Sequence, residues 1–124
     1  MAITKTSVSL LATTSVTTLS TTKTSPGATS ATLNTNTYYG GTVGWKITNG
    51  ASAPGVALAL CIQASHDGTN WYDLGTVFGD TTASSINSGL IDFPKNLMYM
   101  RAIAYANTLN AVTVEAYIQA TTAL

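Results

Sequence analysis

The stretch Val56–Phe78 (VALALCIQASHDGTNWYDLGTVF) most constrains how this chain folds, because two apolar runs flank a polar turn. The first run places apolar side chains at every second position, on one face of a strand: Val56, Leu58, Leu60, Ile62 and Ala64. The turn His66–Asn70 has Asp-Gly at its centre, where glycine accepts a positive φ and Asp can bond its own backbone. The apolar pattern resumes at Trp71. This stretch therefore predicts a β-hairpin.

Other segments show the same strand periodicity. Val43, Trp45 and Ile47 alternate with polar or small residues, and Ile86–Phe93 is a short strand-like run. Leu97–Tyr105 is apolar on both faces, which predicts a central strand between the core and a second covered surface. In the last segment the alternating apolar residues are Val112, Val114, Ala116 and Ile118. No window has a helical apolar stripe with caps, so we expect an all-β fold, an antiparallel β-sandwich of jelly-roll or immunoglobulin-like type.

The two ends of the chain differ in composition, which suggests a division into two parts. Residues 1–37 are rich in Thr and Ser, and short strands are expected around Val8, Leu10 and Val16. We interpret this part as an extended arm that pairs with a neighbouring sheet edge and that the sandwich does not need for folding; a solvated tail is the alternative. Residues 38–124 form the predicted β-sandwich body.

The composition limits the classes of partner. Only 8% of the 124 residues are charged, and five basic residues balance five acidic ones. Scattered single cations argue against nucleic-acid binding, and no apolar run approaches the ~20 residues of a membrane helix. The N-terminus lacks the apolar core of a signal peptide, and the one cysteine, Cys61, is expected to be a strand residue. So little charge predicts that much of the surface lies against other subunits. The alternative is a free domain that is kept soluble by Ser, Thr, Asn and Gln.

The chain offers few residues for chemistry. Asp67 and Asp73 bracket the hairpin turn, but their spacing matches no calcium loop, and Asp in a turn usually caps its own backbone. His66 has no second His nearby, and no glycine motif precedes a helix. The sequence therefore predicts no enzyme, no metal site and no cofactor. We expect Arg101 and Glu115, on strands that pair, to form an ion pair either across the two strands or between subunits.

The aromatic and arm residues are interpreted as contacts between subunits. The predicted interface consists of Val8, Leu10, Tyr38, Tyr39, Trp71, Tyr72, Tyr99, Arg101 and Tyr117. Aromatic side chains on alternating strand positions usually serve the core or an interface. The alternative is a platform on which a sugar stacks.

Three segments carry a family resemblance: Gln63–Leu74, Met98–Ala102 and Ala111–Tyr117. Together they resemble small virion proteins of tailed bacteriophages, which have a Thr-rich start, an S-x-D-G-T-N-W turn, a Y-x-R strand and a terminal Val/Thr strand. The turn is also similar to that of discoidin-type sandwiches, in which the tryptophan is structural.

The phage resemblance implies a capsid decoration or cement protein in the virion, assembled in the cytoplasm of a bacterial host. Its partners would be the major capsid protein and copies of itself, with no direct contact to nucleic acid or membrane. One alternative is a carbohydrate-binding module for host adhesion, in which Tyr38, Tyr39, Trp71 or Tyr72 contacts a glycan. A tail or collar component is the other.

Overall fold

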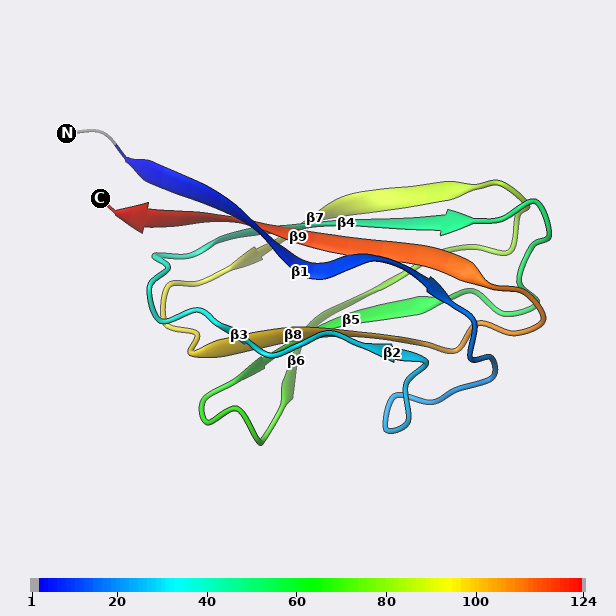
Figure 1. Ribbon diagram of the computed structural model, residues 1–124, viewed down its shortest axis with the longest axis horizontal. Helices are drawn as coiled ribbons and strands as arrows, with labels where there is room; N and C mark the ends of the chain where they lie inside the picture. The colour runs from blue at the N-terminus through cyan, green and yellow to red at the C-terminus, as the bar shows by residue number, and fades with distance from the viewer. Residues whose placement is uncertain (1–2, 124) are drawn as a thin grey trace.

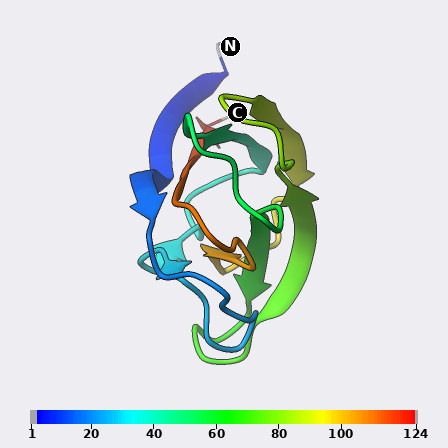
Figure 2. The ribbon, with the colours of Figure 1, turned by 90° about the vertical axis from the view of Figure 1, so that its right-hand side faces the viewer.

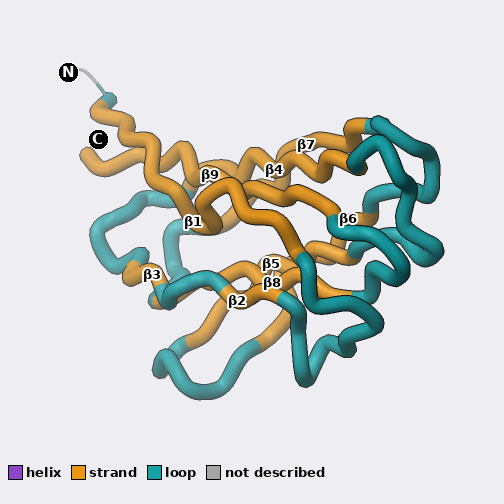
Figure 3. The backbone as a smooth tube through the Cα atoms, turned by 45° about the vertical axis from the view of Figure 1, so that its right-hand side comes forward, coloured by secondary structure: helices purple, strands orange, loops and turns teal. Residues whose placement is uncertain are grey.

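The computed structural model describes residues 3–123, which form nine β-strands and no helix (Figures 1 and 3). The strands are β1 (Thr4–Val16), β2 (Ala28–Thr29), β3 (Leu33–Asn34), β4 (Gly41–Asn49), β5 (Ala59–Ser65), β6 (Tyr72–Phe78), β7 (Ile86–Phe93), β8 (Tyr99–Tyr105) and β9 (Val112–Ala123). Within this range no helix is long and apolar enough to cross a membrane.

The strands form two antiparallel sheets that pack face to face (Figure 2). The first sheet has the order β1-β9-β4-β7, and the second has the order β2-β8-β5-β6 with β3 also paired to β8. Both β2 and β3 run along β8, so they act as one interrupted strand. The chain then has eight strand positions, and all but one of its connections pass from one sheet to the other. This is the jelly-roll arrangement, so the predicted antiparallel sandwich is confirmed and its topology is settled.

The core lies between the sheets and follows the predicted alternation. Leu60 and Ile62 of β5 face Val114 and Ile118 of β9 across it, all without exposed surface. The hairpin prediction is confirmed by the pairing of β5 with β6, but β5 begins at Ala59 rather than at Val56. The backbone N–H of Gly55 donates a hydrogen bond to the carbonyl of Thr108, in the connection between β8 and β9. The residues just before β5 are therefore held by this connection, and strand pairing begins after them.

The Thr-rich N-terminal segment belongs to the sandwich itself. β1 is a continuous strand of 13 residues that pairs with β9 of the same chain, so that its first residue, Thr4, lies opposite Ala123 (Figure 1). The register of this pair shifts between Ser9 and Leu11, and both Leu10 and Leu11 are buried. β1 thus covers part of the core. Its buried apolar side chains next to the bulge anchor it to the sandwich, in contrast to the predicted arm that the fold can lose.

The connection between β1 and β2 crosses the outer face of the second sheet. Lys23 in this connection forms an ion pair with Asp73 on β6, although β2 pairs at the other side of that sheet, with β8. Cys61 and Ile103 point to this outer face and are nevertheless buried. β8 is therefore a central strand covered on both faces, as its sequence predicts, and burial raises the pKa of the Cys61 thiol.

Candidate functional site

The turn between β5 and β6 is organised by the carboxylate of Asp67. Its Oδ1 accepts hydrogen bonds of 2.8 Å from the backbone N–H groups of Thr69 and Asn70. Ser65 supports the same turn, since its Oγ accepts the N–H of Gly68, which has a φ of +77°. The hydrogen bonds from the backbone N–H groups of Asn70 and Thr69 hold the pKa of Asp67 well below its usual range. The prediction that this Asp caps its own turn is confirmed.

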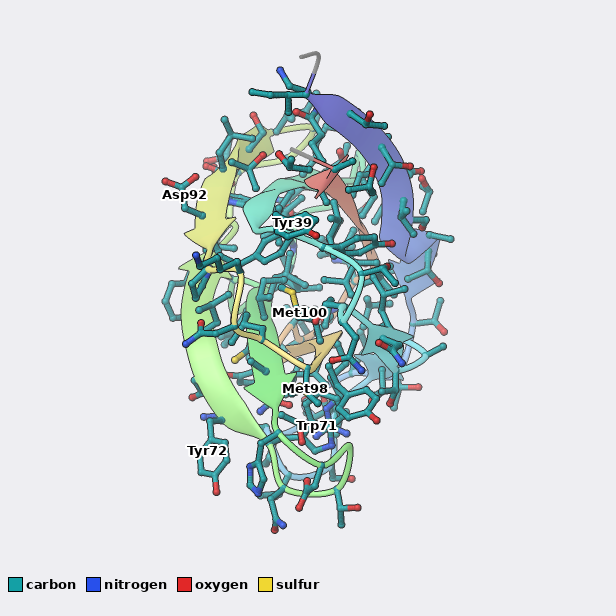
Figure 4. The ribbon with its side chains drawn as sticks, turned by 90° about the vertical axis from the view of Figure 1, so that its left-hand side faces the viewer. Tyr39, Trp71, Tyr72, Asp92, Met98 and Met100 are labelled. Atoms are coloured by element: carbon teal, nitrogen blue, oxygen red, sulfur yellow. The ribbon has the colours of Figure 1, made fainter. Side chains whose placement is uncertain are left out.

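The two aromatic residues after the turn point to opposite sides of the hairpin (Figure 4). Trp71 lies toward the outer face of the second sheet, where the guanidinium carbon of Arg101 is 4.3 Å from the centroid of its ring. Tyr72 is 60% exposed and stacks on His66 with ring centroids 6.0 Å apart. Only Trp71 therefore contributes to the polar surface beside β8.

A chain of polar contacts crosses the outer face of the second sheet. Arg101 donates from Nε to Oε1 of Gln63 at 2.8 Å, and Gln63 donates from Nε2 to Asp73 at 3.1 Å. Asp73 also accepts a hydrogen bond from Lys23. The hydrogen bond from Lys23, and to a smaller extent that from Gln63, lowers the pKa of the Asp73 carboxyl. Gln63 is only 5% exposed. It therefore holds Arg101 and Asp73 in fixed positions on either side of it.

These residues border a groove of about 590 Å³, which we call the Arg101 groove. It lies between the β1–β2 connection and the β5–β6 turn. The residues that line it are Lys23, Thr24, Pro26, Thr29, Gln63, Thr69, Asn70, Trp71 and Arg101. Most of these side chains carry hydroxyl, amide or cationic groups, so the groove suits a ligand rich in oxygen atoms.

The outer face of the first sheet carries a different kind of surface. Leu90 on β7 and Tyr117 on β9 lie in register on either side of Gly44, and they are 69% and 39% exposed. They border a shallow hollow of about 580 Å³ whose floor includes Gly44. Ile86, further along β7, is also exposed. We call Gly44, Ile86, Leu90 and Tyr117 the first-sheet face.

The predicted interface residues are distributed over several surfaces. Trp71, Tyr99 and Arg101 share the outer side of the second sheet, whereas Tyr117 belongs to the first-sheet face. The others lie elsewhere: Tyr72 on the opposite side of the hairpin, Tyr39 exposed before β4, Tyr38 packed against the core, Val8 half-buried opposite Ile118, and Leu10 buried in the core. As a contact surface between subunits the set stays a prediction, and Leu10 has almost no area to offer a partner.

The expected cross-strand ion pair between Arg101 and Glu115 is wrong, whereas a pair between subunits stays a prediction. Their strands, β8 and β9, are consecutive in the chain but belong to different sheets. Glu115 instead pairs with Lys46 of the neighbouring β4 at 3.1 Å, which lowers its carboxyl pKa. For the same reason the aromatic residues do not form one platform, since Trp45 and Tyr117 lie in the first sheet and Trp71 in the second.

Sequence reasoning missed several residues of both surfaces. Lys23 and Gln63 gave no signal, because they meet Arg101 only through the fold, and Gly44 and Leu90 looked like ordinary strand residues. Across residues 3–123, no cluster of three or more His, Cys, Asp or Glu side chains has the geometry of a metal site.

Comparison with known proteins places the fold. No protein-family model and no curated protein sequence matches this chain. Among solved structures, the chain is similar to YomS, a protein derived from the SPBc2 prophage, with a TM-score of 0.53, 16% identity and coverage of 96% of both chains. A chain in the structure of infectious bursal disease virus strain Gx gives a TM-score of 0.56 with 12% identity, over 98% of this chain and 32% of that one.

The K3 cleaved adhesin domain of Lys-gingipain from Porphyromonas gingivalis w83 is also similar, with a TM-score of 0.50 and 12% identity. That match covers 74% of this chain and 62% of the adhesin chain. This chain thus spans less than two thirds of the adhesin and about a third of the viral protein, but nearly the whole of YomS. At such low identity these likenesses show a shared β-sandwich fold.

Proposed function

We propose that this chain is a structural protein of a tailed-phage virion, a decoration or cement protein that binds the coat lattice without catalysis. The observation that carries the proposal is the first-sheet face. Leu90 and Ile86 are 69% and 61% exposed on the outer side of one strand, and Tyr117 lies two strands away. Large apolar side chains grouped on an exposed sheet face favour burial against another protein.

The physical basis of this binding is the removal of apolar surface from water. Fully burying one large aliphatic or aromatic side chain contributes roughly 1.5–3 kcal/mol, so the three side chains of the first-sheet face supply a modest affinity for each copy. Glu115 borders the hollow and already pairs with Lys46, so docking over the hollow leaves that carboxylate paired. Asp92, two residues beyond Leu90 on the same exposed side of β7, is in no ion pair of the described chain and must stay at the wet rim of the contact. Many copies on one lattice would together stabilise the shell against the pressure of packaged DNA.

Two comparisons support this assignment over other uses of the fold. The sequence resembles small virion proteins of tailed phages in its turn and last strands. The fold is shared with a prophage-derived protein over nearly the full length of both chains, and with a chain of a viral particle. The partners in this proposal are the major capsid protein and further copies of this chain, and the location is the virion.

Quantitative proteomics of purified particles from the source culture tests the proposal. The measured quantity is the number of copies of this chain relative to the major coat protein. A ratio near one, or a simple fraction of the lattice, supports decoration of the capsid. About a dozen copies per particle would transfer the protein to the tail or collar, and absence from the particles would overturn the virion assignment.

A further inference from the structure

Arg101 carries a charge that no acidic group of the described chain neutralises. Two Lys–carboxylate ion pairs occur within residues 3–123, Lys23 with Asp73 and Lys46 with Glu115, and the imidazole of His66 lies 3.4 Å from the carboxylate of Asp67. None of them includes Arg101. Its Nε donates to Gln63, and its two terminal nitrogens make no hydrogen bond to any described residue. These nitrogens are therefore available to an external anion at the Arg101 groove.

The guanidinium is also held in place before any ligand arrives. Trp71 lies against its flat side at 4.3 Å from the ring centroid, and the buried amide of Gln63 accepts from its Nε at 2.8 Å. Gln63 is in turn held by Asp73, which Lys23 fixes from the crossing connection. A cation that is oriented in advance loses little side-chain freedom on binding, and such orientation is typical of a binding site.

We propose that the Arg101 groove binds a saccharide that carries a carboxylate, such as a uronic acid unit. The planar guanidinium presents two N–H groups in the geometry that a carboxylate accepts. Around it, the hydroxyls of Thr24 and Thr29 and the amide of Asn70 both donate and accept, as sugar hydroxyls require. The volume of about 590 Å³ lies within the range of small-ligand sites, roughly 300–1,000 Å³.

An acidic peptide is the competing ligand, and the position of the groove disfavours it. Extended peptides usually gain affinity by adding a strand to an open sheet edge. The floor of the groove is formed by side chains of β5 and β8, which are paired on both sides, so their backbone groups are already used. The ligand must therefore be recognised by side chains alone, which suits a ring with hydroxyl and carboxylate groups.

This site is separate from the first-sheet face, which lies on the opposite sheet. Saccharide binding neither requires nor tests the location in the virion. Its experiment uses the isolated full chain in solution, so its failure can be distinguished from failure of the coat-binding proposal.

The test is titration of the full chain with trigalacturonic acid, followed by calorimetry and by amide chemical shifts in NMR. The neutral trisaccharide maltotriose and a triglutamate peptide are the comparison ligands. We expect trigalacturonic acid to bind more tightly than either and to shift the amides of Thr29, Asn70 and Trp71. Arg101→Gln should weaken this binding at least about tenfold, since a charge-assisted hydrogen-bond pair is lost.

Lys95→Gln provides the matched control, because it removes one exposed positive charge outside the groove and should leave the affinity unchanged. Shift mapping on the unaltered chain keeps the test decisive even if Arg101→Gln does not fold. The proposal is overturned if maltotriose binds equally well, if triglutamate binds more tightly, or if the shifted amides lie away from the groove. It is also overturned if folded Arg101→Gln retains full affinity.

Discussion

Asp67 and Asn70 are joined by two hydrogen bonds, one on each oxygen of the Asp67 carboxylate. The backbone N–H of Asn70 donates to Oδ1 at 2.8 Å, and its side-chain amide donates to Oδ2 at 2.7 Å. Both bonds are strongest when the carboxylate is ionised. The turn that positions Trp71 beside Arg101 is therefore coupled to the charge of Asp67.

Acidification is expected to destabilise the fold through this group. The pKa of Asp67 is lower in the folded chain than its unfolded value of about 3.9, so ionisation contributes stability above that pH. That contribution is lost as the pH falls from about 4 toward the folded pKa. Asp73, Asp80 and Glu115 have lowered pKa values as well, and their contributions have the same sign.

The measurement is the urea midpoint of unfolding between pH 7 and pH 2. We expect the midpoint to fall below about pH 4, and to fall less in Asp67→Asn, which cannot lose this charge. NMR titration of the carboxyl carbons should show Asp67 still ionised where ordinary Asp residues are protonated. A midpoint that rises on acidification would contradict this prediction.

Position 41, at the start of β4, should accept only glycine. A Cβ on Gly41 would overlap the carbonyl oxygen of Gln119 and lie 2.8 Å from the Cα of Ala120, both backbone atoms of β9. Gly41→Ala should therefore lower the free energy of unfolding by about 1–3 kcal/mol or more, because paired backbones cannot separate without losing their ladder. Gly50→Ala is the control, since nothing lies within 4 Å of its Cβ and the expected change is within about 0.5 kcal/mol. Equal effects in thermal or urea unfolding would refute the steric argument.

β1 should be necessary for the stability of the sandwich. Leu10 is 5% exposed and packs in the core, so Leu10→Ala should lower the free energy of unfolding by about 2–4 kcal/mol. Ser15→Ala, at an exposed position of the same strand, should change it by less than about 0.5 kcal/mol. Urea unfolding of the two variants measures both effects. A folded chain of unchanged stability after Leu10→Ala would restore the interpretation of residues 1–37 as a dispensable arm.

The sequence predicts the positions of the strands better than it predicts which strands pair with one another. Alternation in Val112–Ile118 and Leu58–Ile62 is a local signal, because a strand beside a core must place apolar side chains on one face. It says nothing about which strand lies beside it. β8 and β9 follow one another with a short connection, yet they lie in different sheets, and so the predicted cross-strand pair of Arg101 and Glu115 is wrong.

The Arg101 groove was predictable only in part for the same reason. Trp71 and Arg101 stood out as an aromatic and a lone cation on strands. Their contact, however, depends on β6 and β8 flanking β5. The other side of the groove depends on the connection that contains Lys23, which crosses the sheet and has no apolar pattern. Such contacts between distant parts of the chain are set by tertiary structure, which the local patterns of one sequence do not contain.

The first-sheet face should be the side of the protein that docks on the coat. Leu90→Glu places a charge at its centre and should weaken binding to particles stripped of this protein by about ten- to a hundredfold, because an unpaired charge would replace a buried side chain. Phe78→Glu is the matched control, since Phe78 is 61% exposed on the outer side of the second sheet. Both positions are exposed, so neither change should alter the melting temperature appreciably. Binding is measured as occupancy of the stripped particles at increasing protein concentration. If Phe78→Glu abolishes binding while Leu90→Glu does not, the docking side is the second sheet, and the first-sheet face loses its assigned role.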